Sequence, residues 1–209
     1  MSINKEHKSR PVLQCVVFSA VVLSGAFMSA ADENARTTTK LVVDFDSETV
    51  PWRSVDDSVM GGVSSSRMRL ENGTAVFEGE LSLENNGGFA SVRSGILEID
   101  LEGFEGVRLR VKGDGQKYQF RIRSNSDFDG PSHQMTFETK NGAWIEVDLA
   151  FSEFVAAYRG RQLPNHPPID SGEVATMGFL IADNQAGNFR LEIDWIQAYQ
   201  SVEDSDSDE

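Results

Sequence analysis

Two stretches decide the fold of this chain: WRSVDDSVMGGVSSS at residues 52–66 and FEGELSLENNGGFASVR at residues 77–93. Each contains a Gly-Gly pair, Gly61-Gly62 or Gly87-Gly88, and each runs into a strand-like segment. Glycine weakens a strand, and it is placed where the backbone needs a positive φ or has a very close neighbour. The two pairs therefore predict two shaped loops at one end of a β-sheet, where alanine should destabilise the protein.

The first of these loops also carries two adjacent carboxylates, Asp56 and Asp57. A glycosidase pair acts from opposite sides of a bond, with its carboxyl groups about 5 Å or more apart. Adjacent residues of one strand point apart instead. We therefore expect Asp57 and Ser58 to shape or cap the loop through side-chain hydrogen bonds, with a cost of about 0.5–2 kcal/mol for Asp57→Ala.

Alternation of apolar and polar residues extends outward from these loops and predicts an all-β protein. It is clear at residues 74–81, at 107–111 and 118–122, and at 143–149. Residues 97–101 are expected to form a further strand. The runs on either side of Gly113-Asp114-Gly115 predict a hairpin with one buried face and one basic face. Without a convincing helical period, about nine to eleven strands indicate an antiparallel β-sandwich or jelly roll.

Several of these motifs resemble a known family. DDSVMGGVSSS, FEGELSLENNGGFASVRS and VRLRVKGDGQKYQFRIR, with Trp144 before VDLAF, the stretch 154–161 and GNFRLEI at 187–193, are similar to the complex I intermediate-associated protein 30 family. The resemblance covers roughly residues 41–199. It implies a jelly roll of the galactose-binding-like type and a chaperone-like role in assembling NADH:ubiquinone oxidoreductase.

The N-terminal residues predict export. Lys5, Lys8 and Arg10 precede an apolar run over 12–28, and Ser29-Ala30-Ala31 offers a cleavage site near Ala31. We expect a signal peptide at 1–31 and a periplasmic or extracellular mature protein with no stable membrane span. An uncleaved anchor is the alternative, although the run of about 16 residues is short of the about 20 that span a bilayer.

The rest of the chain divides into three parts. We expect a flexible lead-in at residues 32–40, the β-sandwich domain at 41–199 and a disordered acidic tail at 200–209. The net charge of −14 argues against nucleic acid or an anionic membrane as the main partner.

The residues that catalysis requires are scarce. Cys15 is the only cysteine and lies in the expected signal peptide, so the mature chain has no disulfide and no catalytic thiol. His133 and His166 belong to no His-Glu-x-x-His motif, and neither a nucleophile elbow nor a phosphate-binding loop occurs. The sequence therefore predicts a protein that is not an enzyme and has no cofactor.

A metal site is not predicted either. Residues 125–130 resemble the first half of a calcium loop, but the twelfth position is Thr136 instead of glutamate, so a polar turn is expected. A structural calcium held by Asp44, Asp46 and Asp194 would rest on fold analogy alone.

Candidate binding residues come from the basic face and from aromatic residues. Arg108, Arg110, Lys112, Arg121 and Arg123 would repel one another across a hairpin unless something compensates them. Acidic side chains of the chain itself would do so, and so would an acidic partner or an anionic sugar. Trp52, Trp144 and Trp195 are either core residues or flat surfaces for sugars or proteins. The candidate binding set is Trp52, Asp57, Arg93, Arg110, Asp114, Arg121 and Arg159.

Two functions follow from these observations. The first is an exported, non-catalytic binding or assembly protein, whose partner is a protein such as a membrane oxidoreductase subunit. The alternative is a secreted carbohydrate-binding module of the jelly-roll type, whose partner is a glycan. An exported protein would not meet an oxidoreductase arm in the cytoplasm or matrix, but it would reach membrane-embedded subunits from the other side.

Overall fold

The computed structural model describes residues 37–46, 50–97, 99–124 and 129–201, all within one compact unit, Ala35–Glu209. The expected signal peptide at 1–31, residues 32–36 of the lead-in, residues 125–128 of the calcium-like loop and residues 202–209 of the tail lie outside the described residues. No helix in the part of the chain that the structure describes has the length and apolar character needed to cross a membrane.

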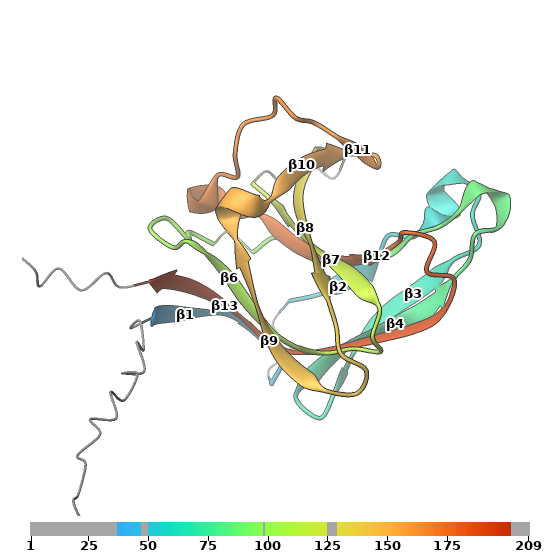
Figure 1. Ribbon diagram of the computed structural model, residues 1–209, viewed down its shortest axis with the longest axis horizontal. Helices are drawn as coiled ribbons and strands as arrows, with labels where there is room; N and C mark the ends of the chain where they lie inside the picture. The colour runs from blue at the N-terminus through green and yellow to red at the C-terminus, as the bar shows by residue number, and fades with distance from the viewer. Residues whose placement is uncertain (1–36, 47–49, 98, 125–128, 202–209) are drawn as a thin grey trace, which may run out of the picture. The chain divides into compact units, whose positions relative to one another are not determined.

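The strands form two antiparallel sheets that pack face to face as a sandwich (Figure 1), which confirms the predicted fold class. In the first, sheet A, the order is β3-β4-β13-β6-β9, and β1 also pairs with the long strand β13. Its strands are β1 (Thr37–Asp44), β3 (Ser65–Glu71), β4 (Thr74–Leu81), β6 (Gly106–Lys112), β9 (Trp144–Ala150) and β13 (Gly187–Ser201).

The second, sheet B, has the order β11-β10-β8-β7-β12-β5-β2. Its strands are β2 (Trp52–Ser54), β5 (Ala90–Ser94), β7 (Lys117–Arg123), β8 (Ser132–Glu138), β10 (Val155–Tyr158), β11 (Arg161–Gln162) and β12 (Thr176–Ile181). Four short 3-10 turns complete the described elements: η1 (Asp57–Met60), η2 (Glu84–Asn86), η3 (Phe151–Glu153) and η4 (Ser171–Glu173).

The core lies between the sheets and follows the alternation of the sequence. In β4 and β6 the residues Phe77, Leu81, Val107, Leu109 and Val111 are buried, while the charged residues between them reach the outer face of sheet A. Facing them from sheet B are fully buried aromatic residues, Tyr118, Phe120 and Phe179. The rings of Phe77 and Tyr118 meet edge to face at 6.4 Å across this interior, a favourable geometry for aromatic pairs.

The predicted hairpin around Gly113-Asp114-Gly115 is wrong. Strand β6 pairs with β13 and β9 in sheet A, whereas β7 pairs with β12 and β8 in sheet B. The turn thus crosses from one sheet to the other, because both runs turn their apolar side chains toward the same interior. Their basic residues consequently lie on opposite outer faces of the sandwich instead of forming one face.

Two element boundaries also differ from expectation. Strand β1 begins at Thr37, inside the expected lead-in, because the β-branched residues Thr37 to Thr39 pair with the end of β13. The expected strand at 97–101 does not form: of its described residues only Ile99 makes a β-bridge, to Val174, while the N–H groups of Leu97 and Leu101 bond to the carbonyls of Ala175 and Ser171.

Candidate functional site

The carboxylate of Asp57 fastens two loops together. Asp57 is fully buried, and its oxygen atoms accept hydrogen bonds from the Ser64 backbone N–H at 2.9 Å and from the Ser64 hydroxyl at 2.6 Å. They also accept from the backbone N–H groups of Gly88 at 2.7 Å and Phe89 at 3.3 Å. One side chain thereby ties the 56–64 loop to the 83–89 loop.

Hydrogen bonding keeps this carboxylate ionised. Burial raises the pKa of Asp57. The hydrogen bonds from the Ser64 side chain and from the backbone of Gly88, Ser64 and Phe89 together lower it by more than burial raises it, so the pKa is below its ordinary value. The carboxylate therefore acts as a fixed anchor.

Asp56, the preceding residue, also connects separate segments of the chain through its carboxylate. It accepts from the Ser66 backbone at 2.8 Å, from the Ser66 hydroxyl at 2.6 Å and from the Ser91 backbone at 3.0 Å. The expectation that Asp57 shapes the loop is thus confirmed. Ser58, named with it, is exposed, and its carbonyl accepts the Gly61 N–H at 3.2 Å.

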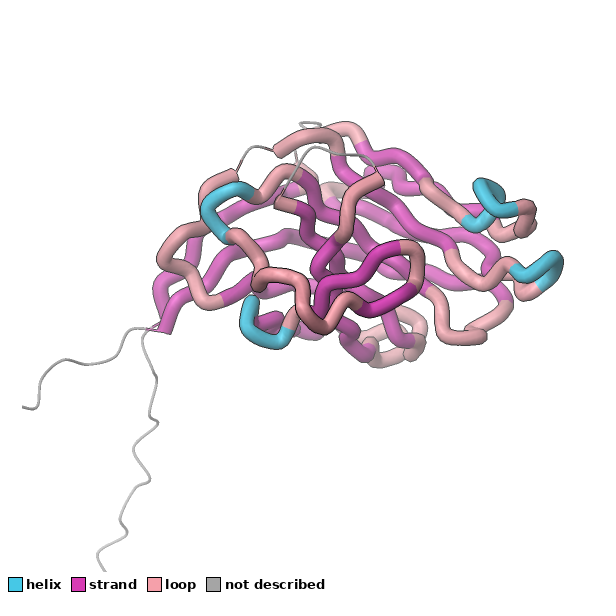
Figure 2. The backbone as a smooth tube through the Cα atoms, turned by 90° about the horizontal axis from the view of Figure 1, so that it is seen from above, coloured by secondary structure: helices cyan, strands magenta, loops and turns pink. Residues whose placement is uncertain are grey.

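Both Gly-Gly pairs converge on Asp57, as their expected role in loop shape requires. Gly61 and Gly88 have positive φ, +94° and +132°. A Cβ on Gly62 would overlap the Asp57 carboxyl group, and one on Gly87 would lie 2.5 Å from an Asp57 oxygen and 2.9 Å from the Glu84 carbonyl. The turns η1 and η2 lie side by side at one end of the sandwich in both backbone views (Figures 1 and 2).

The fastened loops present apolar side chains to solvent. We call this surface the loop tip and define it by four residues with large exposed fractions: Val59 (71%), Met60 (65%), Val63 (52%) and Leu83 (44%). Exposed Glu80 and Glu84 border it. Large exposed apolar side chains gathered on one pair of loops are typical of interaction surfaces. Sequence reasoning missed these residues, although Val59-Met60 directly precedes the first Gly-Gly pair.

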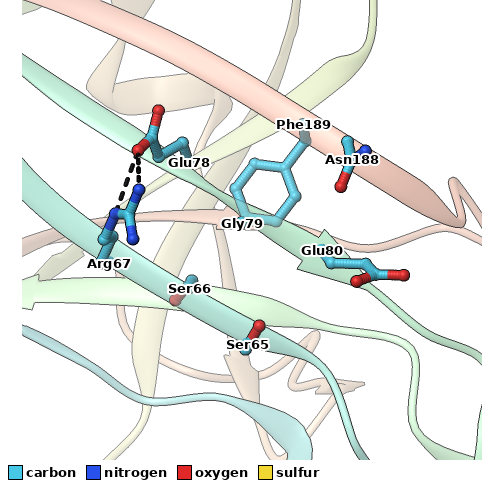
Figure 3. Close-up of a pocket in the computed structure, with 8 residues that line it drawn as sticks. All are labelled: Ser65, Ser66, Arg67, Glu78, Gly79, Glu80, Asn188 and Phe189. Carbon is cyan, nitrogen blue, oxygen red and sulfur yellow. Dashed lines mark hydrogen bonds and ion pairs between the residues drawn. The ribbon is translucent and has the colours of Figure 1, made fainter.

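A pocket opens beside the loop tip, between β3, β4 and the start of β13 (Figure 3). Gly79 allows close approach there, because a Cβ would overlap the Ser65 carbonyl and lie 3.0 Å from the ring of Phe189. Two of its charged side chains are paired, with Arg67 donating to Glu78 at 2.6 Å. The lining is Ser65, Ser66, Arg67, Glu78, Gly79, Glu80, Asn188 and Phe189.

On the outer face of sheet A the basic residues are neutralised by the chain itself. Arg108 pairs with Asp148 at 2.5 Å, Lys112 with Glu192 at 3.2 Å, and Arg110 with Asp194. Glu78 accepts from Arg69, Arg67 and Arg190. The bonds from Arg69 and Arg67 outweigh the opposing effect of burial and lower the pKa of Glu78 to about 2. The basic side chains on this outer face of sheet A are therefore compensated by acidic side chains of the chain itself.

The tryptophans have separate environments. Trp52 packs into the interior, with ring centroids 6.1 Å from Phe45 and 6.0 Å from Phe179. Trp144 is exposed on sheet A, where the cations of Arg110 and Lys112 lie 5.3 Å and 5.7 Å from its ring. Trp195 is half-buried opposite Arg110. The three rings do not form a common platform.

Two other candidate residues make contacts within the chain. Asp114 accepts from the Tyr118 hydroxyl at 3.1 Å and from the Arg190 backbone at 2.9 Å, which fixes the turn between the sheets. Arg159 is exposed, 3.8 Å from Asp129 and 5.2 Å over the ring of Tyr158.

On sheet B, arginines gather on the outer face. Strand register aligns Arg53, Arg93, Gly178 and Arg121 in one row across β2, β5, β12 and β7, and Arg123 lies two residues further along β7. We call Arg53, Arg93, Arg121 and Arg123 the arginine face. Within the described residues, no carboxylate forms an ion pair with Arg121 or Arg123; Arg121 donates to Gln119 at 3.0 Å and Arg123 to the Gly130 carbonyl at 3.5 Å.

Burial without a carboxylate makes these cations costly. Loss of hydration lowers the pKa of Arg121 to about 10, and the nearby Arg93 adds to this effect. The pKa of Arg123 falls to about 9 for the same reason, with further repulsion from Arg93 and Arg121. The hairpin predicted from the sequence places Arg121 and Arg123 on the same face as Arg110. In the structure Arg110 lies on sheet A, whereas Arg121 and Arg123 lie on sheet B.

Neither a metal centre nor a catalytic dyad is apparent in the described part of the chain. Its His, Cys, Asp and Glu residues form no group of three or more that could hold a metal. His133 and His166 lie with ring centroids 5.3 Å apart, and each has a ring nitrogen close to the Pro167 carbonyl, at 3.0 Å and 3.1 Å.

Comparison with known sequences gives one family. The family model described as Complex I intermediate-associated protein 30 matches residues 43–193. The protein "Complex I intermediate-associated protein 30, mitochondrial" of Mus musculus is 29% identical over 169 residues, 71% of this chain and 52% of the relative. A probable counterpart in Caenorhabditis elegans is 28% identical over 161 residues, 68% of this chain and 47% of the relative. The chain thus spans about half the length of these two relatives.

Solved structures share the fold. A family 11 carbohydrate-binding module from Clostridium thermocellum, in complex with a beta-1,3-1,4-mixed-linked tetrasaccharide, superposes with a TM-score of 0.60. It is 17% identical, and the match covers 79% of this chain and 97% of the module. An agarase matches with a TM-score of 0.54 at 11% identity, over 79% of this chain and 25% of the enzyme. At these identities the likeness establishes the jelly-roll fold alone.

Proposed function

The chain belongs to the complex I intermediate-associated protein 30 family, and from this membership we propose that it is a non-catalytic assembly protein that binds subunits of NADH:ubiquinone oxidoreductase. The observation that carries the proposal is the match over residues 43–193, which takes in both loops fastened by Asp57 and most strands of both sheets. The relatives of mouse and nematode are named for association with complex I intermediates. A binding role is further supported by a loop tip that is apolar, exposed and rigidly held.

The loop tip is the surface that we assign to the protein partner. Val59 and Met60 are 71% and 65% exposed, and Glu80 and Glu84 border them. An apolar segment flanked by basic residues complements this surface in both shape and charge. Membrane-embedded subunits offer such segments where a hydrophobic helix meets the aqueous phase.

We expect Met60→Asp to abolish capture of oxidoreductase subunits by the tagged chain in detergent extracts of the cells that produce it. A buried carboxylate at the centre of an apolar interface is strongly unfavourable. The captured subunits would be identified by mass spectrometry and compared with those bound to wild type.

The matched control is Ile96→Asp, which alters an apolar residue that is 60% exposed and lies beyond the opposite end of β5 from the loop tip. It should leave capture unchanged. If wild type retains no oxidoreductase subunit, the assembly role is wrong; if Met60→Asp and Ile96→Asp bind equally well, the partner docks elsewhere.

We also propose that the chain is exported after cleavage near Ala31, on the strength of its basic and apolar N-terminal residues. The mouse and nematode relatives are named mitochondrial, so the two locations need to be distinguished. Intact-mass measurement of the mature protein should give an N-terminus at Ala31 or Asp32. A chain that keeps Met1 in the cytosolic fraction, or that enters mitochondria, would contradict export.

Glycan binding is the second candidate function, and a specific observation favours it. Three buried polar atoms have no hydrogen-bond partner among the residues that the structure describes, and they lie on three adjacent strands of sheet B: Arg121 Nε, Gln134 Oε1 and Thr176 Oγ1. Buried polar groups are normally satisfied, so a cluster of three suggests a ligand with many hydrogen-bonding groups. The test is to measure the binding of monosaccharides to the purified protein by calorimetry.

A further inference from the structure

The arginine face has the geometry of a binding site as well as the charge of one. Gly178 separates Arg93 from Arg121 in the row across sheet B, so no side chain projects from the position between the two arginines. With strands about 4.8 Å apart, their Cα atoms are roughly 10 Å from each other. A Cβ on Gly178 would lie 2.6 Å from the Val92 carbonyl, so this position does not accept a side chain unless the backbone shifts.

The polar atoms near Gly178 that have no hydrogen-bond partner in the described residues specify what a ligand must offer. Gln134 lies directly opposite Arg121, and Thr176 directly opposite Arg123, so all four side chains share the outer face. Arg121 Nε requires an acceptor, Gln134 Oε1 requires a donor, and the Thr176 hydroxyl serves as either. A ligand that satisfies all three atoms must carry both acceptors and donors within a small area.

The charge of the face selects an anion. The protein has a net charge of −14, yet Arg121 and Arg123 are held in partly or fully buried positions without an ion pair to a carboxylate in the described residues. An anionic ligand would restore the electrostatic stabilisation that these guanidinium groups lose on burial. Arginine is suited to this because its planar N–H groups match the two oxygens of a carboxylate.

We propose that the arginine face binds a hydroxylated carboxylate, and that a sugar acid such as a uronate is the ligand class that fits it. The carboxylate pairs with the guanidinium groups of Arg121 and Arg123. The sugar hydroxyls donate to Gln134 Oε1 and exchange hydrogen bonds with Thr176. The neutral side chains Gln119 and Thr136, opposite each other in the next row, extend the surface that hydroxyls can contact.

This inference deepens the glycan-binding candidate and is independent of the assembly role. It differs from a neutral glycan site, where the arginines would be dispensable. It differs also from a site for an acidic protein segment, whose carboxylates sit on flexible side chains without neighbouring hydroxyls.

Isothermal titration of the full chain with glucuronate tests the proposal, with glucose, acetate and an oligo-aspartate peptide as the comparison ligands. Glucuronate should bind with a dissociation constant at least about tenfold lower than that of either glucose or acetate, because only glucuronate supplies both kinds of contact. Thr176→Val preserves side-chain shape, and Arg121→Lys preserves charge while removing the planar N–H groups. Each should weaken glucuronate binding by about tenfold.

Arg67→Met is the matched control, because Arg67 is an exposed arginine of the opposite sheet, already paired with Glu78. It should leave glucuronate binding unchanged. Thermal unfolding shows whether each variant is folded. If Arg121→Lys is not folded, Thr176→Val still decides the test.

The possible outcomes separate the two glycan proposals. Glucose binding that equals glucuronate binding and survives Arg121→Lys would uphold a glycan site and overturn the sugar-acid site. Absence of binding to both sugars would overturn both. Tighter binding of the oligo-aspartate peptide than of glucuronate would assign the face to an acidic protein segment instead.

Discussion

Asp57→Ala is expected to lower the free energy of unfolding by about 3–5 kcal/mol, the largest effect of any single change at the loops. The substitution removes the acceptor for the backbone N–H groups of Ser64, Gly88 and Phe89 and for the Ser64 hydroxyl. Each buried donor left without a partner costs about 1–3 kcal/mol. The cost exceeds the range expected from the sequence because a cap satisfies one or two donors, whereas this carboxylate satisfies four.

Acid should weaken the wild type for the same reason. The pKa of Asp57 is lowered in the folded protein, so its stabilising contribution is complete above the pKa of the unfolded chain, about 3.9, and is lost as the pH falls through the folded value. The difference in unfolding free energy between wild type and Asp57→Ala should therefore narrow below about pH 4. Urea denaturation at a series of pH values measures this difference.

Two further variants make the result interpretable. Ser58→Ala alters an exposed neighbour and should change stability by less than about 0.5 kcal/mol. Asp57→Asn keeps the size of the side chain but turns an amide donor toward the N–H groups, so it should lose nearly as much as Asp57→Ala. An unchanged melting temperature in both Asp57 variants would show that the loops are held by other contacts and that the carboxylate is there for a ligand.

The fold class and the loops could be predicted because they depend on local patterns. Alternation in 74–81 and 107–111 places Phe77 and Leu109 in the interior, and this holds for any strand with which theirs could pair. The glycine pairs could be recognised because no other residue is tolerated so well at a positive φ, as at Gly61 and Gly88. These features need no knowledge of distant contacts.

Strand partners could not be predicted, because alternation defines which side of a strand is buried but not the sheet to which it belongs. Gly113-Asp114-Gly115 has the composition of a hairpin turn, yet it connects β6 in sheet A to β7 in sheet B. That error merged Arg110 and Arg121 into one basic face. Gln134 and Thr176 were missed for the same reason, since only the register across sheet B brings them beside Arg121 and Arg123.

Gly62→Ala is expected to destabilise the protein by about 2 kcal/mol or more, through overpacking rather than backbone strain. Gly62 is not among the glycines with positive φ, so alanine is compatible with its backbone. Its new methyl group, however, would overlap the buried carboxyl group of Asp57 and displace the four hydrogen bonds gathered there. Chemical denaturation of Gly62→Ala alone and combined with Asp57→Ala measures the interaction.

Because the methyl group acts through the carboxylate, the two changes should be less than additive, with a coupling energy of about 1 kcal/mol or more. Gly61→Ala provides the matched control one residue away. Gly61 has φ of +94°, and a Cβ at this position would have no neighbouring atom within 4 Å, so alanine there costs about 1 kcal/mol of strain. That cost should be the same with and without Asp57. Additive energies for Gly62→Ala and Asp57→Ala would mean that the glycine and the carboxylate stabilise the loops separately, and that Gly62 and Asp57 do not act as one structural unit.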